Sequence, residues 1–329
     1  MNIVVSLIIV VGLFCVGFLG AVPGVEFVFA VAIPYVAVAI CTGGMLGRVW
    51  SWANVPVPFR IPTTCGQQKS LPWIKQAKFD NPHNRCTVIG RMIFEVLFFR
   101  SLMRNTKTKL VDGDRLVHTT EIVLWAAALA FHWSLLVILI RHLRFFLEPV
   151  PACLTFLNQL DGFLEMGVPV FYVSTVVFLA ALAMLLLRRL ASAQLRYISL
   201  LEDYLLVFML LAIGLSGLCL RHFDKTDVAG IKELAVSVVS FQPAIPEGIS
   251  PLFYGHLFLV CVLLAYLPFS KLVHIAGALL SPTRCMANSN RAVRHVNPWN
   301  YPVKVHPYSE YEDELRDKMK AAGVPVEKE

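Results

Sequence analysis

Six long stretches of this sequence contain no Asp, Glu, Lys or Arg, and they limit the possible folds more than any other feature. They cover residues 1–25, 27–47, 122–140, 166–187, 204–220 and 248–270. Each is close to the roughly 20 residues that a helix needs to cross about 30 Å of hydrocarbon. Lipid leaves no water to satisfy an open backbone, and the short alternating segments of a β-barrel are missing. The sequence therefore predicts an all-α fold, a polytopic membrane helix bundle with about six transmembrane helices.

The composition agrees with a membrane protein. Hydrophobic residues make up 57% of the chain and charged residues 16%, and the mean hydropathy is +0.65, which excludes a soluble globular protein. The first stretch has no basic segment before it and is too long for the apolar part of a signal peptide. We expect it to remain as a membrane helix.

Most Lys and Arg residues fall on one side of the predicted spans. Residues 48–115, 188–196 and 271–329 hold 12, 3 and 9 of the 29. The other side receives the remaining five: Arg141, Arg144, Arg221, Lys225 and Lys232. The positive-inside rule then predicts a protein of the cytoplasmic (inner) membrane with both termini in the cytoplasm. The net charge of +7 follows from this topology, so we do not expect a nucleic-acid partner.

The polar regions divide the chain into four segments. Residues 1–48 are two N-terminal transmembrane helices, 49–117 a cytoplasmic loop, 118–280 four further helices and 281–329 a cytoplasmic tail. Within the loop, apolar residues at helical spacing predict an amphipathic helix over 86–104, lying either in the membrane interface or on a partner subunit. The tail lacks the apolar content for a core of its own, so we expect it to lie against another protein.

Histidines inside the predicted spans are the strongest candidates for function, because an unpartnered histidine in lipid is costly. His132 and His142 lie in or at the end of the third span, ten residues or about 15 Å apart. His256 and His274 are assigned to the sixth span, 18 residues or about 27 Å apart and on one helix face. The two spans run in opposite directions, so His142 faces His256 at the outer end and His132 faces His274 at the inner end. Two facing imidazoles are what a six-coordinate haem b requires, and two such pairs predict two haems b.

Two alternatives remain open from spacing alone. His118 lies near the depth of His274 and fits the inner position no worse than His132, although Thr119, Thr120 and Glu121 give it a wetter setting. A transporter with a histidine proton relay is the second alternative, but the spans lack the charged residues that transporters use near the midplane.

The eight cysteines include no CxxC pair, so local spacing provides no iron–sulfur or zinc site. Electrons held by this chain would have to leave through a partner.

The histidine spacing, ten residues on one helix and eighteen on the last, resembles that of the gamma subunit of respiratory nitrate reductase. That family comprises membrane cytochromes b with two haems and a quinol site. The resemblance covers about residues 118–280 and implies a four-helix di-haem cytochrome b domain. It also implies axial ligation of haem iron by His132, His142, His256 and His274, paired as above, and so favours His132 over His118.

A second resemblance covers nearly the whole chain, including the first helix, the loop and the tail. It rests on GRMIFEVLFFRSLMRNTK, FHWSLLVILIRHLRFFLEPVP, PFSKLVH, LSPTR and RHVNPWNYPVKVHPYSEYEDELRDKMKAAGVPVEKE. These segments are similar to the DsrM family, the cytochrome b subunits of DsrMKJOP complexes in dissimilatory sulfur metabolism. The resemblance implies electron transfer between menaquinol or menaquinone and a cytoplasmic iron–sulfur subunit of the DsrK type. The membrane subunit of a heterodisulfide reductase is an alternative with the same chemistry and another partner.

Polar residues beside the outer histidine pair are candidates for the quinone site: Arg141, Arg144, Asp161 and Glu165. A quinol that loses protons and electrons beside a haem needs polar groups there, and the nitrate reductase resemblance implies quinol oxidation at the outer haem. The alternative is that the arginines reach the interface and the acidic residues belong to a solvated loop. We expect a quinone-reactive electron-transfer subunit of an oxidoreductase, with no catalytic site beyond haem and quinone.

Overall fold

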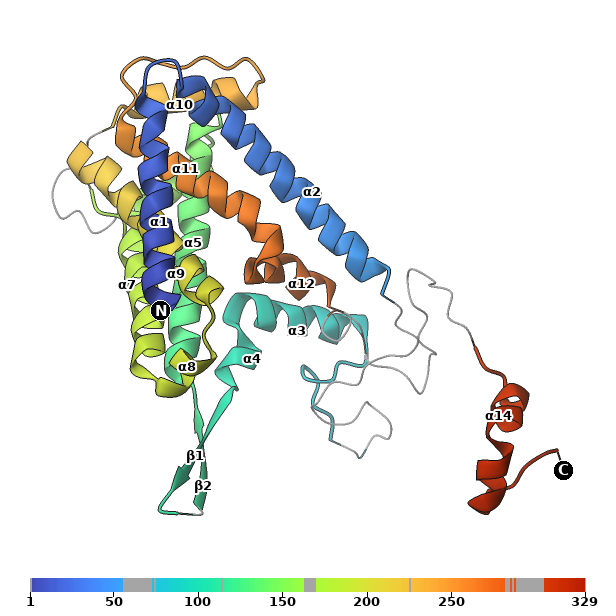
Figure 1. The fold of residues 1–329 in the computed structure, drawn as a ribbon. Coiled ribbons are helices and arrows are strands. Elements are labelled where there is room, and N and C mark those ends of the chain that lie inside the picture. The colour runs from blue at the N-terminus through green and yellow to red at the C-terminus, as the bar shows by residue number, and fades with distance from the viewer. Residues whose placement is uncertain are drawn as a thin grey trace. The chain divides into compact units, whose positions relative to one another are not determined.

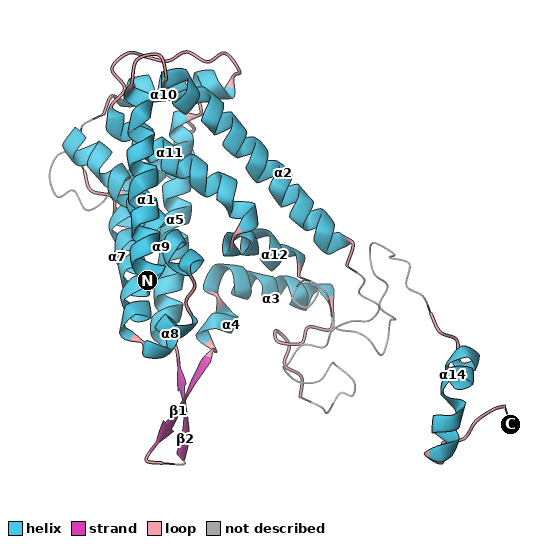
Figure 2. Ribbon diagram, viewed as in Figure 1, coloured by secondary structure: helices cyan, strands magenta, loops and turns pink. Residues whose placement is uncertain are grey.

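The structure is a computed structural model that describes residues 2–55, 73, 75–113, 115–162, 170–224, 226–281, 285, 287 and 305–328. Helices dominate this part of the chain (Figures 1 and 2). Within it, six helices are long and apolar enough to cross a membrane: Asn2–Ala21, Val28–Ala53, Ile122–Phe145, Val173–Ala191, Leu201–Asp224 and Pro251–Phe269. The predicted all-α membrane bundle is therefore confirmed.

The spans are built from α-helices with short 3₁₀ or π segments at their ends. The elements up to the third span are α1 (Asn2–Gly17), η1 (Phe18–Ala21), η2 (Val28–Ala32), α2 (Ile33–Ala53), α3 (Arg85–Phe98), α4 (Arg100–Met103), β1 (Thr106–Val111), β2 (Arg115–Thr120), α5 (Ile122–His142) and η3 (Leu143–Phe145). The later elements are α6 (Ala152–Asp161), α7 (Val173–Ala191), α8 (Ala193–Ile198), α9 (Leu201–Cys219), η4 (Leu220–Asp224), α10 (Val228–Val239), α11 (Pro251–Tyr266), η5 (Leu267–Phe269), η6 (Lys271–Val273), α12 (His274–Leu280) and α14 (Tyr308–Ala321).

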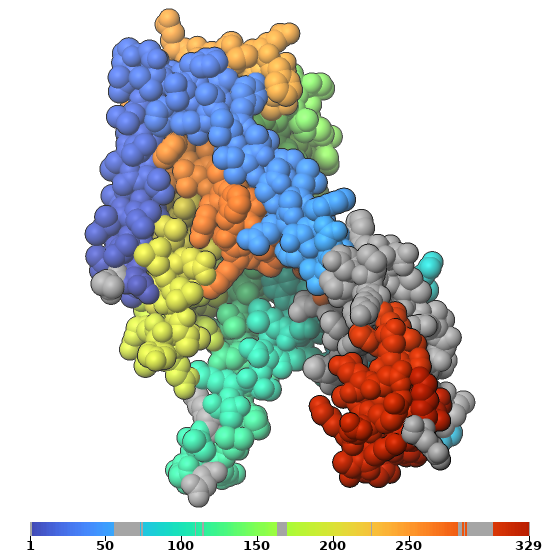
Figure 3. All heavy atoms as spheres, turned by 45° about the vertical axis from the view of Figure 1, so that its right-hand side comes forward, coloured from blue at the N-terminus to red at the C-terminus, as the bar shows by residue number. Residues whose placement is uncertain are grey.

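The bundle alternates in direction from one span to the next (Figure 1). Helix α5 packs on α7, α7 packs on α9, and α9 packs on α1 and α11. One apolar core fills the space between α5, α7 and α9 and consists of Phe131, Phe178, Ala181, Leu182 and Leu210. A second joins η2 and α10 to Tyr254 of α11. In Figure 3 the blue surface of α1 and α2 covers part of the orange surface of α11.

Helices α1 and α11 approach closely at glycine. A Cβ atom on Gly17 would lie 2.6 Å from the Cα atom of Gly255, which no side chain tolerates. Small residues at such contacts let membrane helices pack without a hydrophobic driving force. This contact fixes α11 beside the N-terminal helix just before His256.

The region between the second and third spans differs from its prediction in two ways. The predicted helix over 86–104 is divided at Phe99 into α3 and α4, because Phe99 has φ 50 and cannot continue a right-handed helix. An antiparallel hairpin, β1 and β2, then precedes α5 and was not predicted. Asp112 and Gly113, in the connection between the strands, have φ 50 and 87, positive values that Asp and Gly tolerate in tight turns. His118 lies in β2, opposite Thr108, and not on α5.

The sixth span also ends earlier than predicted. Helix α11 stops at Tyr266, and η5 and η6 follow before α12 begins at His274. Pro268 provides no backbone N–H, and Ser270, with ψ 177, caps the next turn by accepting a bond from the Leu272 N–H. The assumption of one continuous helix from His256 to His274 is therefore wrong, and with it the common face and the 27 Å spacing.

The chain divides into two compact units, one of residues 1–46 and 89–280 and one of residues 47–88 and 281–329. The first unit contains all the histidines assigned to the spans. In the second, Glu312 of α14 is buried and accepts hydrogen bonds from the backbone N–H groups of Glu327 and Lys328. The bond from Glu327 holds the pKa of Glu312 below its usual range. The final residues therefore fold back on α14.

Candidate haem-binding site

The four candidate histidines come from three helices. His132 and His142 lie on α5, His256 lies on α11, and His274 is the first residue of α12. We call His132 and His274 the inner pair, and His142 and His256 the outer pair, after the predicted orientation. Helices α5 and α11 make most of their contacts with other helices, since α5 packs mainly on α7 and α11 packs mainly on α1 and α9.

The rings of the inner pair lie close to each other. Their centroids are 6.1 Å apart and their planes are inclined by 76°. A metal ion bonded to two imidazole nitrogens at about 2 Å each, with each ring centre roughly 1 Å further away, separates the centroids by about 6 Å. The spacing of the inner pair therefore fits a single iron held between the two rings.

In the outer pair, the His256 ring packs against α9. The neighbouring helix α9 makes room for that ring with a glycine. A Cβ atom on Gly217 would lie 3.3 Å from Cε1 of His256. A Cβ atom at this position would force the imidazole to shift by a few tenths of an ångström.

Three of the four rings are oriented by a backbone carbonyl of their own chain segment. Nδ1 lies 2.7 Å from the Ala128 carbonyl oxygen in His132, 2.7 Å from that of Ile138 in His142, and 2.8 Å from that of Lys271 in His274. A carbonyl oxygen only accepts, so Nδ1 must be the nitrogen that carries the hydrogen. In the neutral ring, Nε2 then keeps its lone pair, which is the form that ligates a metal.

In His256, the acceptor for Nδ1 is a side chain instead of a backbone carbonyl. Its Nδ1 lies 2.9 Å from the hydroxyl oxygen of Ser216 on α9. That hydroxyl donates its own hydrogen to the Ile213 carbonyl at 3.0 Å, so it accepts from His256. All four imidazoles therefore direct Nδ1 to an acceptor and leave Nε2 for a ligand.

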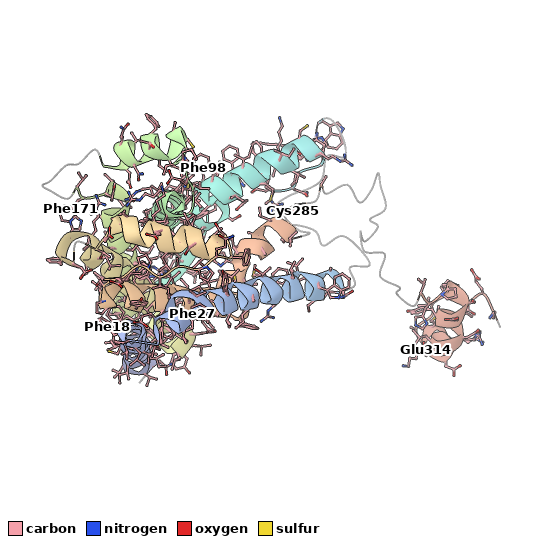
Figure 4. The ribbon with its side chains drawn as sticks, turned by 90° about the horizontal axis from the view of Figure 1, so that it is seen from above. Phe18, Phe27, Phe98, Phe171, Cys285 and Glu314 are labelled. Carbon is pink, nitrogen blue, oxygen red and sulfur yellow. The ribbon has the colours of Figure 1, made fainter. Side chains whose placement is uncertain are left out.

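The other described histidines near the bundle have different surroundings. Nδ1 of His118 lies 3.2 Å from the Thr108 hydroxyl within the hairpin, and His222 stacks on Phe171 with centroids 4.0 Å apart. Phe171 is marked in Figure 4. In the described ranges, no group of three or more His, Cys, Asp or Glu side chains could hold a metal ion. Pairs of histidines, as haem requires, are what this part of the chain offers.

Two of the predicted quinone residues are paired with each other. Nη1 of Arg141 lies 2.8 Å from Oδ2 of Asp161, and their side chains are 11% and 6% exposed. Asp161 also accepts bonds from the Ser174 N–H at 2.8 Å and the Ser174 hydroxyl at 2.6 Å. Nε of Arg141 donates to Asn158 at 3.0 Å. This network joins α5, α6 and the start of α7 beside His142.

The structure does not bring Arg144 into this network. Its guanidinium lies 4.8 Å from the centroid of the Phe145 ring. Glu165, the fourth predicted quinone residue, lies outside the described residues.

Sequence reasoning missed an aromatic ring between two arginines. The guanidinium carbons of Arg141 and Arg221 lie 3.1 and 4.3 Å from the centroid of the Tyr172 ring. Arg221 also donates to the Val170 carbonyl at 3.1 Å. No periodicity relates these residues, which come from three separate segments, so no sequence pattern could have found them.

Comparisons with known proteins find one matching family and two similar relatives. Residues 115–294 match the family described as nitrate reductase gamma subunit. A protein of Archaeoglobus fulgidus is 45% identical over 280 residues, which cover 83% of each chain. A protein of Archaeoglobus profundus is 42% identical over 300 residues, or 89% of this chain and 87% of its own. Both relatives carry the name Hdr-like menaquinol oxidoreductase cytochrome b-like subunit.

Proposed function

Since the chain belongs to the nitrate reductase gamma subunit family, we propose that it is the membrane cytochrome b subunit of a menaquinol oxidoreductase. The observation that carries this proposal is the set of four imidazoles with Nδ1 engaged and Nε2 available, two of which, His132 and His274, have ring centroids 6.1 Å apart. We place the chain in the cytoplasmic membrane with both termini in the cytoplasm.

The two pairs have separate tasks in this proposal. When bound, two haems b supply one-electron redox centres at two depths of the membrane. His142 and His256 would hold the outer one, and His132 and His274 would hold the inner one. The acceptors on Nδ1 keep each imidazole in the ligating form.

Menaquinol is the proposed electron donor at the outer end. Its oxidation to menaquinone releases two electrons to the haems and two protons to water. Arg144 and Glu165 are the residues proposed to contact the quinol and its protons. Arg141 and Asp161 are proposed to support the site without contacting the quinol, since their charges are already paired with each other.

The electrons then pass to a cytoplasmic iron–sulfur subunit beside the inner pair. The printed names of the relatives, with their prefix Hdr, support a partner of the heterodisulfide reductase type. A DsrK-like subunit within a DsrMKJOP-like complex, acting in dissimilatory sulfur metabolism, is the more specific form of the same proposal. It is supported by the resemblance of the loop and tail segments.

The test of the function is a haem count on the intact protein purified from membranes. We expect two low-spin haems b per chain, both reduced by a menaquinol analogue. A haem-free protein would contradict the proposal. It would favour the alternative of a transporter with a histidine proton relay. One haem per chain would contradict the assignment of two pairs.

The partner is tested separately. We propose that the 49–117 loop and the 281–329 tail form its docking surface. Truncation after Ser281 should leave both haems in place and abolish co-purification of the iron–sulfur subunit. Full retention of that subunit by the truncated chain would exclude the tail as the main docking element.

A further inference from the structure

Phe99, between α3 and α4, holds a backbone conformation that aromatic residues rarely adopt. Its φ of 50 and ψ of 46 lie in the left-handed region, which favours glycine. Glycine is the usual residue at this position after a helix. Strain of this kind persists only where the surroundings fix the residue, and it gathers at functional sites.

Two indole groups of α5 fix the end of α3. Nε1 of Trp125 donates to the Phe98 carbonyl at 2.8 Å, and Nε1 of Trp133 donates to the Leu97 carbonyl at 3.0 Å. The last carbonyls of a helix have no partner within the helix, so these bonds satisfy groups that would otherwise be orphaned. The C-terminal end of α3, marked by Phe98 in Figure 4, is thereby attached to the third span.

A buried carboxylate also links α3 to α4 across Phe99. Glu95 is 8% exposed and accepts bonds from the Ser101 N–H at 3.1 Å and the Ser101 hydroxyl at 2.6 Å. Glu95 belongs to α3 and Ser101 to α4, so their bonds span Phe99. The left-handed conformation is held from both sides.

The ring of Phe99 contacts a proposed haem ligand. Its centroid lies 4.9 Å from that of His132, with the planes at 88°. Phe131 packs edge-on against the same imidazole at 4.7 Å. His132 and Trp125 are seven residues apart and so lie on one face of α5. The turn between α3 and α4 therefore packs directly against the proposed ligand His132.

The outer pair has a different aromatic neighbour. The ring nearest to His142 is Phe145, one turn further along the same span, at 5.8 Å and 56°. It is attached to the helix of the ligand itself. Among the described residues, only the inner pair is contacted by an aromatic residue from a separate segment, Phe99, whose backbone is strained.

We propose that Phe99 is a positioning residue for the inner haem, and that it acts by fixing the plane of the His132 imidazole. The bond from Nδ1 to the Ala128 carbonyl sets the tautomer and the mean orientation of the ring. The edge-to-face contacts of Phe99 and Phe131 limit tilting of the ring about that orientation, and the Phe99 contact thereby helps to hold the 76° angle to the His274 plane. The inference rests on the proposed function, because it requires a haem between these rings.

The angle between two axial imidazole planes is measurable in the low-spin ferric state. Nearly perpendicular planes give a strongly anisotropic electron paramagnetic resonance signal with a large highest g value, and parallel planes give a smaller one. Ligand orientation also tunes the midpoint potential. We therefore expect Phe99→Ala to keep both haems and to shift the highest g value and the potential of the inner haem alone.

Two matched variants separate the ring of Phe99 from general damage to α3. Phe99→Tyr keeps the ring and should retain both signals of the parent protein. Phe98→Ala removes the adjacent, 51% exposed ring but keeps the carbonyl bonded to Trp125, and should also leave both signals unchanged. A variant with His142→Ala, in which only the inner haem remains, identifies which signal is which.

Unchanged signals in Phe99→Ala would overturn the inference. If that variant does not fold, Trp133→Phe decides, because it frees only the Leu97 carbonyl and loosens the turn between α3 and α4. A shift of the inner signal alone would support the inference, and no shift would overturn it. Failure of the proposed function looks different, since the unmodified protein would then lack the inner signal altogether.

Discussion

The inner and outer histidine pairs use the same orienting chemistry in opposite surroundings. In both, Nδ1 is held by an acceptor and Nε2 is left for the iron. In the inner pair, His132 is contacted by the rings of Phe99 and Phe131, whereas in the outer pair His142 follows Arg141 of the buried Arg141–Asp161 ion pair. With identical ligands, any difference in potential between two haems has to come from such surroundings.

The largest expected effect is the loss of one haem, and the haem that is lost should differ between the two pairs. His142→Ala or His256→Ala should remove the outer haem, and His132→Ala or His274→Ala the inner haem, because each iron loses one of two axial ligands. Each single variant should fall from two haems per chain to one. Haem content and the remaining electron paramagnetic resonance signal are the measurements.

His118→Ala is the matched control and should retain both haems. His118 lies in the hairpin and bonds to Thr108. Loss of one haem in this variant, with both retained in His132→Ala, would overturn the inner assignment.

The sequence was sufficient for the spans, because charge-free length depends on local composition, and the four haem ligands stay a prediction. The hairpin was missed although its signal was present, since Asp112–Gly113 stands between two runs of strand-forming residues. The break after α11 was likewise readable at Pro268. Other features could not be predicted: Ser216 bonds to His256 across 40 residues, and no periodicity marks such a tertiary pair.

The second effect tests the charge beside the outer pair. Asp161→Asn should destabilise the protein by about 3–5 kcal/mol, because it leaves the buried Arg141 cation without its counterion. The outer haem signal should be disturbed and the inner signal unchanged. Thermal unfolding of the detergent-solubilised protein, followed at both haem signals, is the measurement.

The control for this change is the exposed ion pair between Lys232 and Glu148, whose acidic side chain is 66% exposed. Glu148→Gln should cost at most about 1 kcal/mol, as exposed ion pairs do. Equal stability of Asp161→Asn and Glu148→Gln would show that the Arg141–Asp161 pair does not support the outer site.

The third effect concerns the one orienting group that is a side chain. Ser216→Ala removes the acceptor for Nδ1 of His256 and should weaken outer haem binding by about tenfold, since such partners contribute 10- to 100-fold in affinity. Ser134→Ala is a close match, because Ser134 is also buried and donates to a carbonyl three residues earlier. The rate of haem loss to an acceptor protein should rise for Ser216→Ala at the outer site only. Equal rates in the two variants would remove Ser216 from the ligand support.

The smallest effect tests whether quinol reacts at the outer pair at all. Arg144 stands two residues after His142, and among the described residues no carboxylate pairs with it, so its charge is available to a ligand. A quinol oxygen gains negative charge as its proton leaves, and a cation beside it lowers the barrier. Arg144→Ala should therefore slow haem reduction by a menaquinol analogue about tenfold, the equivalent of one charged hydrogen bond, with both haems retained.

Arg144→Lys should recover part of the rate, and Glu165→Gln should slow it through loss of a proton acceptor. Arg196→Ala, on the predicted cytoplasmic side, should leave it unchanged. If Arg144→Ala and Glu165→Gln both react at the parent rate while Arg196→Ala is slow, quinol oxidation belongs to the inner pair. Phe99 and Phe131 beside His132 would then line the quinone site.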